Sequence, residues 1–269
     1  MLAVGKELLI GRTLNTNAHW IGKRLAKMGS MLKEITTVDD DLKEIGVALN
    51  QALGRSPDFL IVVGGLGPTP DDMTLKGVAG ALGLKLRQSE GALGLIKEHY
   101  AKRGLTSIEL TPSRLKMARL PSGAQALLNE AGTAPGVRLV SGNTIVFCLP
   151  GVPVEMRGIF RRSVEPEVRD KLGRLHRKYI TMKLEGVLES ILAPMISGQL
   201  GRHPGAYIKS HPRGVKEGVS RIELDIAVVG EDRERTISEC EEIAGEMKRA
   251  VIGGGGRVIS AKGLKGGET

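Results

Sequence analysis

Short apolar runs alternate with amphipathic segments through residues 1–175. The runs at 58–63 and 144–149 are rich in β-branched and aromatic residues and lack polar alternation, which predicts strands buried on both faces. Shorter strands are expected at 1–4 and 31–38, and a hairpin around 124–140. Helical spacing of apolar residues predicts helices over 16–29, 39–54, 71–82, 89–103 and 153–172. This alternation predicts an α/β domain with a doubly wound, mostly parallel sheet and helices on both faces.

The pattern changes at residues 176–178, where a short basic connection follows the last predicted helix. The segment 176–252 has the order β-α-β-β-α, which predicts a small α+β domain. Its strands are expected at 179–187, 206–210 and 221–229, and its helices at 188–200 and 231–252. Four consecutive glycines from Gly253 and a polar end predict a flexible tail over 253–269.

Composition narrows the class of protein. No apolar run approaches the ~20 residues that span a bilayer, and the first residues lack the pattern of a secretory signal, so a cytoplasmic protein is expected. Cys148 and Cys240 have no nearby cysteine or histidine at metal-ligand spacing. Residues 1–175 carry 24 Lys and Arg against 17 Asp and Glu, which suits either an anionic ligand or a generally basic surface.

The segment Gly64-Gly-Leu-Gly-Pro-Thr-Pro-Asp-Asp72 directly follows a predicted buried strand and precedes a predicted helix. Gly64, Gly65 and Gly67 permit close approach of backbone amides to a phosphate, with Thr69 beside them. Asp71 and Asp72 supply the oxygen ligands that Mg²⁺ prefers, although both residues could simply stabilise the start of the helix.

Three other loops could contribute to the same site. Gly151 and Glu155 follow the second buried strand, and Glu155 could face a ligand or act only as a first-turn acid. Asn17 could bind a ligand or cap the following helix. A loop of small residues contains Asn129 and Gly132, and Arg114 could pair with phosphate or remain solvated.

The four loops, in this order, resemble the CinA (competence/damage-inducible protein) family of the molybdopterin-binding-domain superfamily. The matching motifs are Gly5-x-Glu-Leu-Leu-x-Gly11 with Asn15-Thr-Asn17, Gly64-Gly-Leu-Gly-Pro-Thr-Pro-Asp-Asp-Met-Thr74, Asn129-x-x-Gly-Thr-Ala-Pro-Gly136 and Pro150-Gly-Val-Pro-x-Glu-Met156. The resemblance covers residues 1–172. Residues 176–252 resemble, by order of elements, the small KH-type domain that follows in that family.

The resemblance implies a molybdopterin-binding-like fold and an ADP-ribose pyrophosphatase, which cleaves ADP-ribose to AMP and ribose 5-phosphate with Mg²⁺ or Co²⁺. Asp71 and Asp72 would then hold the metal, and Glu155 or Glu7 would complete its shell or orient water, so that Asp71, Asp72 and Glu155 are the expected catalytic residues. A homodimer is also expected. The C-terminal amidase domain of longer family members is not expected here. Lys6 stands where many members have Asp, which puts a metal role beside Glu7 in doubt.

Two alternatives remain. The chain could bind a pterin phosphate or nucleotide in molybdenum cofactor metabolism without hydrolysing it, because the superfamily fold does not fix the chemistry. It could also bind nucleic acid through Gly198-Gln-Leu-Gly201, which has the spacing of a KH loop. The 15 Lys and Arg against 13 Asp and Glu after residue 175, and the scarcity of aromatic residues, make nucleic acid an unlikely partner.

Overall fold

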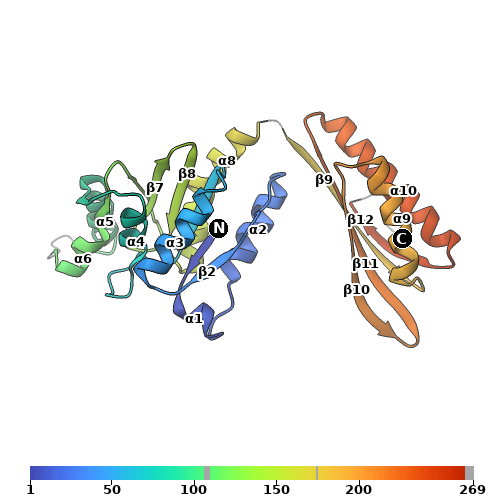
Figure 1. Cartoon of the computed structure of the whole chain (residues 1–269), viewed down its shortest axis with the longest axis horizontal. Helices are drawn as coiled ribbons and strands as arrows, with labels where there is room; N and C mark the ends of the chain where they lie inside the picture. The colour runs from blue at the N-terminus through green and yellow to red at the C-terminus, as the bar shows by residue number, and fades with distance from the viewer. Residues whose placement is uncertain (106–109, 174, 264–269) are drawn as a thin grey trace. The chain divides into compact units, whose positions relative to one another are not determined.

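A computed structural model describes residues 1–105, 110–173 and 175–263 of the chain (Figure 1). The chain divides into two compact units. The first contains residues 1–26 and 31–171, and the second contains residues 27–30 and 172–269.

The first unit is built on a six-stranded sheet with the order β2-β1-β3-β8-β7-β6. Four neighbouring strands are parallel, and they are β2 (Thr36–Val38), β1 (Leu2–Val4), β3 (Phe59–Val63) and β8 (Thr144–Leu149). The last two, β7 (Gly136–Ser141) and β6 (Gln125–Leu127), continue the sheet antiparallel. A separate pair joins β4 (Leu86–Gln88) to β5 (Arg119–Pro121). The predicted α/β class with a mostly parallel sheet is confirmed.

Helices surround this sheet, and Figure 1 shows this part of the chain in colours from blue to yellow. They are α1 (Lys6–Leu9), α2 (Thr16–Lys27), α3 (Leu42–Leu53), α4 (Thr74–Ala81), α5 (Glu90–Ala101), α6 (Pro112–Met117), α7 (Pro153–Ile159), the π-helical turn η1 (Phe160–Val164) and α8 (Glu165–Leu172). Asp41 caps α3 by accepting hydrogen bonds from the amides of Lys43 and Glu44. Apolar side chains of α3, α4, α5 and α6 pack with those of the central strands in one buried core.

Two predicted elements are shorter than the sequence suggests. The helix expected over 71–82 begins only at Thr74, because Asp71 and Asp72 belong to a turn in which the Asp72 amide donates to the Thr69 carbonyl. The strand expected over 31–38 is limited to Thr36–Val38, and Met31 and Ile35 are exposed.

The second unit contains an antiparallel four-stranded sheet with the order β10-β11-β9-β12. Its elements are β9 (His176–Glu185), α9 (Glu189–Arg202), β10 (Tyr207–Lys216), β11 (Val219–Gly230), α10 (Arg233–Gly253) and β12 (Arg257–Lys262). Figure 1 shows both helices on one face of the sheet. Ile180, Met182 and Leu184 alternate along β9 and pack into the core beneath the helices.

The flexible tail expected over 253–269 is wrong for residues 257–262, which form β12 and pair with β9. The four glycines make a tight reversal, in which the Gly255 amide donates to Ile252 and the Gly256 amide to Val251. Gly255 has a φ of +82°, and a Cβ on Gly256 would lie 3.0 Å from Val187. The glycines therefore turn the chain back onto the sheet, while residues 264–269 lie outside the described part.

The contact between α3 and α4 depends on Gly77, because a Cβ there would lie 2.6 Å from a methyl carbon of the buried Ile45. We expect Gly77→Ala to lower the free energy of unfolding by about 1 kcal/mol, since the clash outweighs the gain in helix propensity. Gly80→Ala, on the exposed side of the same helix with open space around it, should raise it by about 0.5 kcal/mol. Urea unfolding measures both; equal stability of the two variants would contradict this account of the packing.

Candidate ligand-binding site

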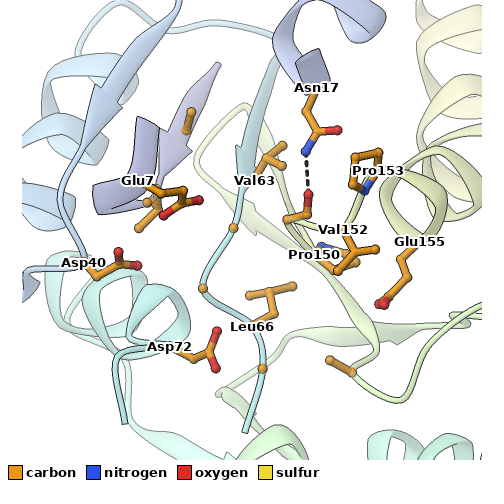
Figure 2. A pocket seen from close by; sticks show the side chains of 18 of the residues that line it. Glu7, Asn17, Asp40, Val63, Leu66, Asp72, Pro150, Val152, Pro153 and Glu155 are labelled. Atoms are coloured by element: carbon orange, nitrogen blue, oxygen red, sulfur yellow. Dashed lines mark hydrogen bonds between the residues drawn. The ribbon is translucent and has the colours of Figure 1, made fainter. Parts of the chain in front are cut away.

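A pocket of about 610 Å³ lies where β1, β3 and β8 end in the first unit (Figure 2). Loops that follow these three strands form most of its wall, with contributions from Asp40 after β2 and from Thr133 and Ala134. The carboxyl edge of a parallel sheet is where α/β domains place their ligands. The topology therefore brings the separate sequence motifs to one place.

The glycine loop after β3 passes too close to its neighbours for side chains. Gly64 has a φ of +111°, and a Cβ there would overlap the carbonyl oxygen of Val4 at the end of β1. Gly65 has a φ of +62°, and a Cβ there would overlap the Thr74 hydroxyl at the start of α4. The Gly64 amide donates to the Leu149 carbonyl at 3.0 Å. These contacts fix the loop between β1, β8 and α4 and leave its backbone facing the pocket.

Asp71 and Asp72 have different environments although they are adjacent. Asp72 Oδ2 accepts from the Thr69 amide at 2.9 Å and from the Thr69 hydroxyl at 2.5 Å, and the Lys116 ammonium donates to the Thr69 carbonyl. Asp72 thus holds the turn. Asp71 is fully exposed, and its pKa is lowered chiefly by the nearby Thr69 hydroxyl, so it is ionised at neutral pH.

An acidic edge beside the glycine loop is formed by Glu7, Asp39, Asp40 and Asp71. The pKa of Asp40 is raised, first because the carboxyl is partly buried and then because Glu7, Asp39 and Asp71 repel its charge. The Lys6 amide opposes this shift by donating to Asp40 Oδ2 at 2.9 Å. The Lys6 ammonium lies 3.5 Å from Asp39. Lys6 therefore neutralises the outer part of the edge and leaves the pocket side negative.

Glu155 lies on the other side of the glycine loop from Glu7, Asp40 and Asp72 (Figure 2). Asn129 donates to Glu155 Oε2 at 2.7 Å and to the Ala134 carbonyl at 2.8 Å, while its Oδ1 accepts from the amides of Ala131 and Gly132. A Cβ on Gly132 would overlap the Glu155 carboxylate. The loop that contains Asn129 and Gly132 thus packs closely around Glu155 and fixes the orientation of its carboxylate.

Asn17 joins α2 to the loop after β8, because its Nδ2 donates to the Gly151 carbonyl at 2.7 Å (Figure 2). Its Oδ1 is buried and accepts no hydrogen bond from the described residues. Asn15 caps the helix instead, by accepting from the Ala18 amide at 3.0 Å. The Asn17 oxygen is therefore available to a ligand donor.

The structure brings most of the predicted site residues to this pocket. Those that line it are Glu7, Asn17, Gly64, Gly65, Gly67, Asp71, Asp72, Gly151 and Glu155. Three other predicted residues do not line the pocket but contact residues that do. Thr69 contacts Asp72, and Asn129 and Gly132 contact Glu155. Arg114 contacts Tyr100 instead, with its Nε 3.3 Å from the hydroxyl and its guanidinium 4.7 Å from the ring centre. Its proposed phosphate contact stays a prediction.

The sequence analysis missed Asp40, which follows β2 at the same sheet edge. The three acids at 39–41 stood only at the start of a predicted helix, and Asp41 is the N-cap of that helix. A test for acids directly after each predicted strand would have found Asp40, because all parallel strands end at one edge.

All charged side chains on the described pocket wall are acidic. Glu7, Asp40, Asp71, Asp72 and Glu155 line it, and no lysine or arginine does so among the described residues. Within the same part of the chain, no three His, Cys, Asp or Glu side chains converge in a geometry that could hold a metal ion. The predicted ligand set of Asp71, Asp72 and Glu7 stays a prediction.

Comparisons with known proteins agree with the fold and the motifs. Residues 1–170 match the family described as "probable molybdopterin binding domain", and the chain belongs to this family. The first unit is similar to the crystal structure of the protein CinA, of unknown function, from Thermoplasma acidophilum. The two are 43% identical with a TM-score of 0.57, covering 62% of this chain and 96% of that one. The resemblance to CinA is thereby confirmed.

Relatives extend over nearly the whole chain. A protein from Metallosphaera sedula is 42% identical over 94% of this chain and 93% of its own. One from Aeropyrum pernix is 39% identical over 96% of this chain and 95% of its own. The two units therefore occur together in relatives. No described helix is long and apolar enough to cross a membrane.

The raised pKa of Asp40 predicts a stability effect with a definite sign. Its contribution to stability is present below the ordinary carboxyl pKa of 3.8 and is lost as the pH rises through the higher folded pKa. Asp40→Asn keeps an oxygen acceptor for the Lys6 amide and removes the charge. We expect Asp40→Asn to raise the Tm at pH 7. The difference in Tm between the variant and the wild type should shrink below pH 3.8. Asp170→Asn, an exposed carboxylate on α8, should change the Tm little at either pH. A lower Tm for Asp40→Asn at pH 7 would contradict the repulsion described.

Proposed function

We propose that the chain binds a small phosphorylated ligand of the pterin or nucleotide class in this pocket. The observation that carries the proposal is the glycine-rich loop Gly64-Gly65-Leu66-Gly67 at the carboxyl edge of the sheet, between two sets of carboxylates. Membership of the molybdopterin-binding family supports this ligand class.

The phosphate end of the ligand would bind the glycine loop. Gly65 and Gly67 leave their backbone open to the pocket, whereas the Gly64 amide already donates to the Leu149 carbonyl; a Cβ on Gly67 would lie 2.6 Å from Asp72. Backbone amides bind phosphate oxygens without the entropy cost of ordering long side chains. Because Asp72 and Thr69 already fix the turn, the loop is preorganised for this contact.

The heterocyclic end would use the polar groups across the loop. Pterin and adenine rings carry N–H donors, which a carboxylate or amide oxygen accepts. Glu155 is oriented by Asn129, and the Asn17 oxygen is buried without a described partner. Both groups therefore suit a donor-bearing ring or ribose rather than a second phosphate.

A divalent cation would resolve the charge conflict between phosphate and the acidic wall. Five carboxylates and no basic side chain line the described pocket, so a bare phosphate would be repelled. Mg²⁺ is commonly held by one or two carboxylates together with ligand phosphates, and this mode needs no cage of three protein ligands. The carboxylate oxygens of Asp71, Asp40 and Glu7 are ligands of the kind that Mg²⁺ prefers.

The second candidate is hydrolysis of a nucleotide-sugar pyrophosphate, with ADP-ribose cleaved to AMP and ribose 5-phosphate. The exposed, ionised Asp71 beside the loop and the fixed Glu155 opposite favour it. Water would add across the P–O–P bond, and a bound cation would neutralise the diphosphate and lower the pKa of water. Glu155 would orient or deprotonate that water, and the loop amides would stabilise charge at phosphorus.

One experiment separates binding from hydrolysis. Purified protein is incubated with ADP-ribose, with and without Mg²⁺ or Co²⁺, and AMP is followed by chromatography. In parallel, calorimetry measures binding of AMP and of a phosphorylated pterin under the same metal conditions. We expect metal-dependent binding of at least one of these ligands. AMP release in addition would establish the hydrolase, and absence of both binding and turnover with metal would refute the proposed function.

Asp71→Asn tests the metal role, with Asp170→Asn as a matched control that removes an equal charge from an exposed position. Asp71→Asn should weaken metal-dependent binding, or slow AMP release, by about a hundredfold, since it removes a charged oxygen ligand. The control should behave as wild type. Unchanged Mg²⁺ dependence in Asp71→Asn would remove this residue from the metal site.

A homodimer and a cytoplasmic location stay predictions.

A further inference from the structure

A second pocket, on the other side of α7, has the opposite charge to the first. It has a volume of about 550 Å³ and shares only Pro153 with the acidic pocket. Arg157, Arg161 and Arg162 line it, and Glu130 is the one carboxylate on its described wall. The π-helical turn η1 contains Arg161 and Arg162, and π-helical turns within helices occur often at functional sites.

Two of the three arginines are held in place by Trp20 of α2. Trp20 lies with its ring centre 5.6 Å from the Arg157 guanidinium carbon and 5.5 Å from that of Arg161. Trp20 itself packs edge-on against the buried Phe160, with ring centres 5.4 Å apart. Stacking on an aromatic ring restricts a guanidinium and leaves its N–H groups free to bind in the plane. The cluster is therefore preorganised.

Two of the three arginines carry uncompensated charge among the described residues. Arg162 pairs with Glu130 at 2.6 Å. Arg157 and Arg161 form no ion pair there, and the Arg157 Nε is buried without a hydrogen-bond acceptor. A buried N–H without an acceptor is costly, and a guanidinium fork matches the oxygens of a phosphate. The chemistry of the site therefore suits an oxyanion.

We propose that this arginine pocket binds a phosphate-bearing anion, either inorganic phosphate or diphosphate or the phosphates of a nucleotide. The volume of the pocket suits a small ligand, and three guanidiniums against one carboxylate suit a multiply charged one. The proposal is independent of the ligand of the acidic pocket. It also assigns a role to Trp20 and η1, which the first site does not use.

Trp20 is the only tryptophan in the sequence, so its fluorescence reports on this pocket. The full-length protein is titrated with pyrophosphate in EDTA, which excludes metal-assisted binding in the acidic pocket, and calorimetry repeats the measurement. We expect a saturable change that NaCl of equal ionic strength does not produce. ADP in place of pyrophosphate distinguishes a nucleotide-borne from a free diphosphate by its affinity. No saturable binding of either, or an equal response to NaCl, would overturn the proposal.

Arg161 is exposed and forms no ion pair with the described residues, so its replacement should leave the fold intact. Arg161→Ala should weaken pyrophosphate binding by about tenfold or more, and Arg161→Lys, which keeps the charge but loses the fork, by less. Arg103→Ala removes the same charge from an exposed position outside the pocket and should bind as wild type. Undiminished calorimetric binding to Arg161→Ala, or loss of binding in Asp71→Asn instead, would overturn the assignment.

Discussion

The close approach of Gly64 to the end of β1 is the constraint on which the acidic pocket depends. A side chain at this position would strike the Val4 carbonyl, and its positive φ would strain any other residue. The Gly64 amide meanwhile closes the hydrogen bond to Leu149. One residue thus holds the ends of three parallel strands together, and the loops that follow them can meet only because those ends are so near.

Electrostatics divides the first unit into two regions separated by α7. Glu155, on this helix, faces the acidic pocket, whereas Arg157 and Arg161 face the basic one. Helix α2 contacts the same stretch of chain at three successive turns: Asn17 reaches Gly151, Trp20 reaches the arginines, and Arg24 pairs with Glu165. These contacts fix the orientation of α7 along its length. Glu155 therefore stays toward the acidic pocket, and the arginines stay toward the basic one.

The sequence predicted the fold well because buried parallel strands leave unmistakable apolar runs, as at 59–63 and 144–149. It also predicted which loops meet, since parallel strands end at one edge. It could not distinguish Asp72, which holds a turn, from Asp71, which is exposed, because that difference rests on two hydrogen bonds from Thr69 to Asp72. It left Arg114 between a phosphate contact and a solvated position, since charge alone does not reveal the packing on Tyr100. The arginine pocket depends on long-range packing that local patterns do not encode, whereas the position of Asp40 just after a predicted strand was readable from the sequence.

The glycine reversal before β12 bears on how the second unit can be handled in isolation. Strand β12 covers one side of β9, so a chain cut after α10 would leave β9 as an edge with unpaired amides and carbonyls. Such an edge invites pairing between molecules, and a fragment with that boundary would tend to aggregate even though its core residues on β9 and α10 were all present. Expression boundaries for this unit therefore belong after Lys262.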